Sequence, residues 1–151
     1  MDFSTLQPTD FGINRQGEKT AMSEYEDLRQ TTMDTAKMLF GERDPNSTDV
    51  DQSAFSLWKE FDPELAKHIS MFYTGRLYAR EVISQKQREL CAVASLTVLD
   101  KPAELKAHIK AAMNVGASKE EVAEVIFQQC TYGGVPVMVE GLRILHDVVH
   151  D

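Results

Sequence analysis

Hydrophobic side chains recur along most of the chain at spacings of three and four residues, which places them on one face of a helix. The stretch SQKQRELCAVASLTVL, residues 84–99, is a clear case. No segment alternates apolar and polar residues in the manner of a half-buried strand. The sequence therefore predicts an all-α, single-domain bundle of six or seven helices, without an internal repeat or a low-complexity segment.

Capping signals locate the ends of two helices in the second half of the chain. Pro102 is favoured at the first position of a helix, and Gly116 is suited to end the helix that begins there. Ser118 is followed three residues later by Glu121, which predicts a capping box ahead of the next apolar run. These signals predict one helix from Pro102 and another from Ser118.

The amino-terminal part has a different character. Residues 1–22 mix proline, glycine and polar residues without periodicity, and we expect an extended or partly disordered arm. From Ser23, with Glu26 as its capping-box partner, the pattern predicts a helix that ends at Gly41. Residues 23–151 are then expected to form one helical domain, because 151 residues suit a single core.

Large apolar side chains between residues 55 and 78 are more numerous than one small monomer needs for its core. They occupy wider stripes than a single helical face. Surplus apolar surface of this kind predicts contact between subunits, so we expect a homo-oligomer. The residues in question are Phe55, Trp58, Phe61, Phe72, Tyr73 and Tyr78.

Charge and composition narrow the classes of partner. The formal net charge of −8 and the isoelectric point near 5.0 argue against nucleic acid or an anionic membrane as the main partner, because both attract basic surfaces. The first twenty residues lack the features of a signal peptide, and no apolar run is long enough to span a membrane. We therefore expect a cytoplasmic protein. Cys91 and Cys130 lie in apolar segments that are predicted to be helical, and both are expected to be buried thiols of the core.

Two acidic residues and one histidine are candidates for chemistry. Glu104 and His108 are four positions apart, which places both on one helix face within reach of each other. Histidine can give or take a proton near neutral pH, and a nearby carboxylate can orient it. Glu89 lies in an otherwise apolar run, where a carboxylate needs a partner. The alternatives are a solvent-exposed Glu104–His108 pair and a surface Glu89.

The other histidines carry less weight. His68 lies among apolar helical residues and is expected to be an interior histidine, while His146 and His150 lie near the end of the chain and are assigned no role. A metal site built from Glu89, Glu104 and His108 lacks a second histidine at helical spacing or a cysteine cluster. We expect neither a metal nor a cofactor.

The segment RELCAVASLTVLDKPAELKAHIKAAMNVGASKEEVAEVIFQQCTYGGVPVMVEGLRI resembles the core of the carboxymuconolactone decarboxylase family. A helix start with arginine, an EL..H helix, an N.G.S.EE turn and a Y.G.P segment follow in the family's order. The resemblance covers roughly residues 77 to 146, although Glu81 stands where many members have proline. It implies the all-α fold of alkyl hydroperoxidase D-like proteins for residues 23–151, assembled as a trimer or hexamer.

Alkyl hydroperoxidase D-like proteins carry Cys-x-x-Cys-x-x-x-His on their active helix and a relay glutamate on the preceding helix. That pattern places the histidine at His108 and the glutamate at Glu89, with Lys101 and Glu104 at the two cysteine positions. Peroxide reduction by this mechanism requires an attacking and a resolving thiol. Since both are missing, the sequence disfavours a thiol peroxidase.

The resemblance instead implies a cofactor-free decarboxylase-like enzyme that acts on a small carboxylated lactone or a related unsaturated acid. Alternatives are another proton-transfer enzyme, such as an isomerase or cyclase, on the same pocket, and a non-catalytic oligomeric member. The implied catalytic residues are His108 as general acid or polarising donor, Glu89 as its proton partner and Glu104 as orienting group. The implied substrate-binding residues are Arg80 or Arg88, and Tyr132 in the Y.G.P segment.

Overall fold

A computed structural model describes residues 15–42 and 54–150, with side chains from residue 21 onward. Within these ranges every regular element is a helix, so the predicted all-α fold is confirmed. The elements are α1 (Arg15–Phe40), α2 (Ala54–Phe61), α3 (Pro63–Ser70), the π-helical segment η2 (Met71–Tyr78), α4 (Gln85–Val98), α5 (Pro102–Asn114), α6 (Lys119–Gln128), α7 (Cys130–Gly133) and α8 (Val135–His150).

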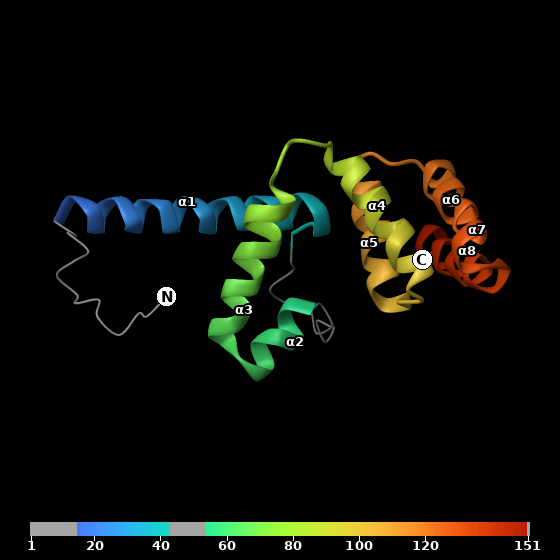
Figure 1. The fold of residues 1–151 in the computed structure, drawn as a ribbon, viewed down its shortest axis with the longest axis horizontal. Coiled ribbons are helices and arrows are strands. Elements are labelled where there is room, and N and C mark those ends of the chain that lie inside the picture. The colour runs from blue at the N-terminus through green and yellow to red at the C-terminus, as the bar shows by residue number, and fades with distance from the viewer. Residues whose placement is uncertain (1–14, 43–53, 151) are drawn as a thin grey trace, which may run out of the picture.

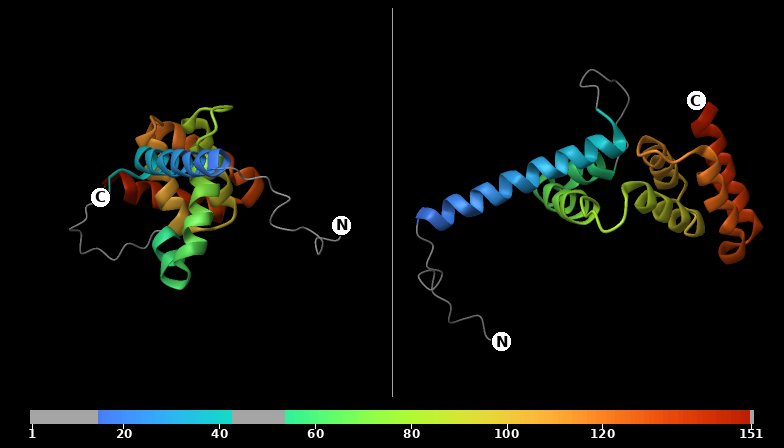
Figure 2. Two further views of the ribbon diagram at one scale, coloured as in Figure 1. Left: turned by 90° about the vertical axis from the view of Figure 1, so that its left-hand side faces the viewer. Right: turned by 90° about the horizontal axis from the view of Figure 1, so that it is seen from above.

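The helices are arranged along an elongated molecule (Figure 1). The long helix α1 extends away from the rest at its amino-terminal end, and η2 lies against its other half. Helix α3 continues from η2 away from α1, and α2 packs against α3. Helices α4 to α8 gather at the opposite end of the molecule, as the view from above also shows (Figure 2). None of the helices in the described ranges is long and apolar enough to cross a membrane.

The main core lies between α4, α5, α6 and α8. Gly141 lets α8 approach its neighbours closely, because a Cβ atom there would lie 2.9 Å from Cγ2 of Ile126 and 3.2 Å from Cγ2 of Thr97. Such tight packing explains why the fully buried side chains concentrate in this half of the chain. The buried core residues are Val93, Leu105, Ile109, Ala112, Ala117, Val122, Ile126, Ile144 and Leu145.

A second, smaller core joins this bundle to α1. Leu39 of α1, Tyr78 of η2 and Ala111 of α5 are buried together. Asn114 at the end of α5 donates a hydrogen bond of 2.8 Å from Nδ2 to the carbonyl oxygen of Leu39. This small core fixes the carboxyl-terminal end of α1 and η2 beside α5, where the candidate histidine lies.

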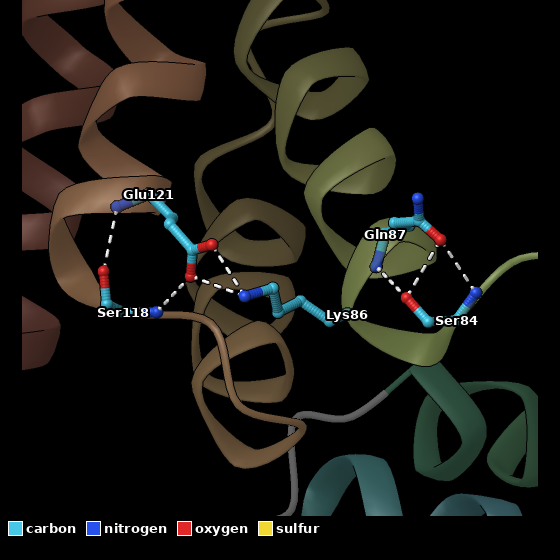
Figure 3. Close-up of polar contacts among 5 residues, drawn as sticks. All are labelled: Ser84, Lys86, Gln87, Ser118 and Glu121. Carbon is cyan, nitrogen blue, oxygen red and sulfur yellow. Dashed lines mark hydrogen bonds and ion pairs between the residues drawn. The ribbon is translucent and has the colours of Figure 1, made fainter.

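Capping boxes begin two of the bundle helices (Figure 3). The predicted box of Ser118 and Glu121 is confirmed at the start of α6. A second box of the same kind, Ser84 with Gln87, begins α4. Lys86 Nζ then pairs with the Glu121 carboxylate at 2.6 and 2.9 Å, so the capping glutamate of α6 also ties α6 to α4. The predicted helix start at Pro102 and end near Gly116 are confirmed as well.

The predicted amino-terminal arm is wrong in its last part. Helix α1 begins already at Arg15, and Ser23 lies inside this helix rather than at its cap. The helical periodicity of residues 15–22 is weak in the sequence, and the helix there has no partner to bury a face against among the described residues. Gly41, with φ of 79°, ends α1 as predicted. Residues 1–14 of the predicted arm lie outside the described residues.

Three predictions of burial are also corrected. Cys91 is exposed on α4, so it is not a core thiol, and Cys130 is only half-buried; both are free. His68 is exposed on α3 rather than interior. Cys91 and His68 lie on exposed faces of their helices, and an apolar composition alone does not identify which face is buried.

The surplus of apolar side chains is confirmed only in part. Phe61 is 79% exposed, and Phe72 is exposed on η2. Tyr78 is buried within the chain and Tyr73 packs against it, so these two tyrosines serve the protein's own core. Burial of the exposed residues by a second copy stays a prediction.

Candidate active site

Glu89 of α4 and His108 of α5 lie side by side in the interior of the helical hairpin that α4 and α5 form. Oε2 of Glu89 and Nδ1 of His108 are 2.7 Å apart. The Glu89 side chain is 0% exposed, and that of His108 is 13% exposed. The structure thus brings together two of the three predicted catalytic residues as a buried carboxylate–imidazole pair that is accessible only from the histidine side.

Unpartnered polar atoms surround this pair on one face of α4. Oε1 of Glu89, Nε of Arg88 and Oε1 of Gln85 are all buried, and none has a hydrogen-bond partner in the described part of the chain. Residues 85, 88 and 89 share a helix face because they are separated by three and four positions. Buried polar groups are normally hydrogen-bonded, so three such atoms together indicate a place that receives polar groups from outside the chain.

Aromatic rings form one wall of the site. The ring of Tyr78 lies 6.3 Å from the His108 ring, and that of Phe40 lies 6.2 Å from it in an edge-on arrangement. Tyr73 packs on Tyr78 with centroids 4.6 Å apart. Burial raises the pKa of Tyr78 well above its usual range, and its hydrogen bond with Tyr73 and the nearby Glu89 carboxylate add to the effect. The Tyr78 hydroxyl is therefore a neutral group at physiological pH.

Arg88 is held in place at this wall. Its NH2 group donates a hydrogen bond of 2.8 Å to the carbonyl oxygen of Arg80, and its guanidinium carbon lies 5.6 Å from the centre of the Tyr78 ring. The Arg80 side chain itself is exposed, and its contribution here is the backbone carbonyl. Of the two predicted carboxylate-binding arginines, Arg88 is the one that the structure places beside the pair.

A family comparison adds to this geometry. The model of the carboxymuconolactone decarboxylase family matches residues 63–147, more than half of the chain. The chain belongs to the carboxymuconolactone decarboxylase family. The resemblance drawn from the sequence motifs is thereby confirmed, and the matched region contains Glu89, His108, Arg88 and both tyrosines of the wall.

Two relatives are similar to this family member over more than half of its length. It is 28% identical over 92 residues to the 4-carboxymuconolactone decarboxylase of Acinetobacter baylyi, a match that covers 61% of this chain and 69% of that protein. It is 33% identical over 88 residues to an uncharacterized 15.0 kDa protein from the nqo9–nqo10 intergenic region of Paracoccus denitrificans, covering 57% of this chain and 66% of the relative.

Glu104 and Tyr132 are not brought to the pair in this family member. Glu104 is exposed on α5, and among the described residues no hydrogen bond or ion pair joins it to His108. The predicted pairing of Glu104 with His108 is wrong, because the His108 ring turns inward to Glu89 instead. Tyr132 is exposed on α7 and has no ring or hydrogen-bond contact with Glu89 or His108. Their predicted roles in binding and catalysis stay predictions.

Sequence reasoning missed four residues of the site, which are Phe40, Tyr73, Tyr78 and Gln85. Tyr73 and Tyr78 were interpreted only as interface residues, although large aromatic residues just before a candidate glutamate helix also suit a pocket wall. Gln85 donates from Nε2 to the carbonyl oxygen of Tyr78 at 2.6 Å and so fixes the end of η2 against α4. The sequence does not predict this hydrogen bond, because a glutamine in the first turn of a helix has many possible partners.

Two surface grooves of the protein lie outside the Glu89–His108 pair. The larger groove, of about 360 Å³, lies between α1 and the start of α4, and the second, of about 310 Å³, lies along α8. Neither is lined by His108 or Glu89. We regard the buried polar atoms as the better guide to the site, because an enclosed pair with unsatisfied groups is costly without a function, whereas shallow grooves are common. Among the described residues no group of three or more His, Cys, Asp or Glu side chains is arranged to hold a metal ion.

Proposed function

We propose that this protein is a cofactor-free enzyme that decarboxylates a small carboxylated lactone or a related unsaturated acid. The observation that carries the proposal is the buried Glu89–His108 pair, in which a carboxylate with no exposure orients the one imidazole of the site. Family membership and the similarity to a protein named 4-carboxymuconolactone decarboxylase support the choice of reaction.

The chemistry requires a proton donor at carbon. When the carbon–carbon bond to the substrate carboxylate breaks, carbon dioxide leaves and the electron pair stays on the ring carbon, delocalised into the unsaturated lactone. A proton must then be delivered to a carbon atom of that system. His108 is the donor in our proposal: Nδ1 is engaged by Glu89, so Nε2 is the nitrogen that faces the substrate and gives the proton.

Glu89 supports this transfer through the ring. A carboxylate hydrogen-bonded to Nδ1 holds the imidazole ring in one orientation and fixes which nitrogen reacts. Its second oxygen, Oε1, has no partner in the described chain and is free to accept a hydrogen bond from a bound acid or water. The pair therefore combines a proton donor, Nε2 of His108, with a hydrogen-bond acceptor, Oε1 of Glu89.

Arg88 is the group that we assign to the substrate carboxylate that is not lost. Its Nε is a buried donor without a partner, and its NH2 group is already anchored on Arg80. An arginine held in this way binds a carboxylate with a defined orientation and offsets the charge of Glu89. The Tyr78 ring beneath the guanidinium gives the lactone an apolar surface to lie against.

The test uses 4-carboxymuconolactone as substrate and measures carbon dioxide release and product formation. We expect His108→Gln and Glu89→Gln each to lower kcat by about 10²-fold or more, because glutamine keeps hydrogen bonding but transfers no proton near neutral pH. Their effects should be less than multiplicative in the double variant, since the two groups act as a unit.

Glu104→Gln is the matched control: it is the same substitution on the same helix as His108, at an exposed position. It should retain most of the activity if Glu104 has no role in orienting His108. Near wild-type turnover by His108→Gln would show the proposal to be wrong. Conversion of the acid to an isomer without loss of carbon dioxide would favour the isomerase or cyclase alternative on the same pair.

A further inference from the structure

The last two turns of α8 carry two histidines that the proposed reaction does not use. His146 and His150 are four residues apart, and their rings stack with centroids 4.2 Å apart and planes inclined by 24°. The spacing His-x-x-x-His on a helix is one that lets two imidazoles bind a single transition-metal ion. The sequence analysis assigned these residues no role, although they carry this spacing.

The hydrogen bonds of the two rings determine which nitrogens are free. Nδ1 of His150 lies 2.7 Å from the carbonyl oxygen of His146. A carbonyl oxygen only accepts, so Nδ1 must carry the proton, and in the neutral ring the lone pair is on Nε2. Nδ1 of His146 also faces an oxygen acceptor, Oδ1 of Asp147, but at the longer distance of 3.5 Å.

Both rings thus resemble metal-binding histidines, which typically donate their second nitrogen to a carbonyl or a carboxylate. This arrangement fixes the tautomer before any ion arrives. The two Nε2 atoms are left as the available donors. A zinc ion bound at 2.0–2.1 Å lies in the plane of each imidazole that binds it, and the nearly parallel stacked rings share no such point, so the exposed His146 ring must turn before both Nε2 atoms reach one ion.

The surroundings favour a cation. The pair lies in the last turns of a 16-residue helix, where the unpaired carbonyl groups form the negative end of the helix dipole. Asp147 adds a carboxylate, while the nearby Arg143 is engaged with Glu140 at 3.1 Å. His146 is 69% exposed and lines the groove of about 310 Å³ along α8, which leaves room for the ion's remaining ligands.

We propose that His146 and His150 form a two-histidine site for a borderline transition-metal ion such as Zn²⁺, bound through both Nε2 atoms. The remaining coordination positions are filled by water, since no third His, Cys, Asp or Glu of the described residues completes the set. The site is on α8, away from the α4–α5 pair, and it departs from the sequence-based expectation of no metal. It does not depend on the proposed decarboxylase activity.

Isothermal titration of the whole metal-free chain with zinc chloride tests the site. We expect one zinc ion per chain and a loss of affinity of about tenfold or more in both His146→Gln and His150→Gln, because removing one ligand abolishes the chelate. Magnesium should not compete, since it prefers oxygen ligands. All three histidines concerned in the experiment are exposed, so the variants should fold, which circular dichroism checks.

His68→Gln is the control, because His68 is an exposed histidine of α3 with no second histidine at helical spacing. It should bind zinc within about twofold of the wild-type affinity, as expected for a residue outside the chelate. Absence of zinc binding by the wild-type chain would overturn the proposal. So would an affinity that stays unchanged in both α8 variants, because the zinc would then be bound elsewhere.

Discussion

Replacing His108 by leucine should destabilise the protein far more than replacing an exposed histidine. Leucine fills a similar volume, but it leaves the Glu89 carboxylate, 0% exposed, with neither oxygen hydrogen-bonded to any residue that the structure describes. Removal of one partner of a buried ion pair typically costs about 3–5 kcal/mol. For a domain of this size that corresponds to a fall in Tm of about 6–20 °C.

Replacing Glu89 by leucine should destabilise the protein less than replacing His108, and the two losses of stability should not be additive. In Glu89→Leu the unpaired group is His108, which still reaches solvent, so the loss is that of one hydrogen bond, about 1–3 kcal/mol, offset by relief of the buried charge. With both residues replaced by leucine no buried charge remains, and we expect stability near or above that of the wild type. The resulting coupling energy is about 3 kcal/mol or more.

Urea unfolding followed by circular dichroism measures the four free energies, with the oligomeric state checked by light scattering at the same protein concentration. The exposed pair Glu140 and Arg143, at 3.1 Å, is a matched control cycle and should give a coupling below about 1 kcal/mol. If His108→Leu lies within about 0.5 kcal/mol of the wild type, the inference that Glu89 is trapped without another partner is refuted.

Four further outcomes are expected. Gly141→Ala should destabilise the bundle by about 1–3 kcal/mol in urea unfolding, because its Cβ would press on Ile126. The hydrogen bonds that Glu121 accepts from Lys86 and from the Ser118 backbone lower the pKa of Glu121. The stabilisation from this carboxylate is therefore present above its unfolded pKa and is lost as the pH falls through its folded pKa. The difference in Tm between the wild type and Glu121→Gln should shrink between about pH 5 and pH 3. Burial raises the pKa of Tyr78, so its contribution is complete below the unfolded pKa of about 10 and is lost at higher pH; absorbance titration should show a late tyrosinate step that Tyr78→Phe removes. Light scattering should give a mass of a trimer or hexamer, and a mass of 17.0 kDa at micromolar concentration would refute oligomerisation.

Local signals in the sequence predicted the helix boundaries of the bundle well. A capping box, a first-turn proline and a terminal glycine each act within one helical turn, so Ser118, Pro102 and Gly116 mark the same ends in the structure. Helix α1 begins at Arg15, directly after Asn14, a residue type that is favoured at helix N-caps, whereas Ser23 and Glu26 match a capping box that the structure does not use. A motif of two residues is insufficient where the surrounding periodicity is weak.

The candidate site was predictable in its residues but not in its contacts. Glu89 was expected to need a partner because a carboxylate in an apolar run is costly, and His108 was expected on the same evidence as Glu104. Spacing along one helix indicates which groups are able to meet, but the packing of α4 against α5 decides which do. It turns His108 toward Glu89, 19 positions away in sequence, and leaves Glu104 outside.

The two parts of the alkyl hydroperoxidase D-like pattern lie in different environments in this chain. Lys101 and Glu104, at the positions of the two cysteines, are both exposed, so charged side chains are tolerated there without disturbing the core. Glu89 is enclosed and has its partner on another helix, so an apolar residue at position 89 leaves His108 without that partner, and the two positions are expected to be energetically coupled. The two parts are therefore separable: the positions of the two cysteines lie at the exposed start of α5, and the Glu89–His108 pair depends on the packing of α4 against α5.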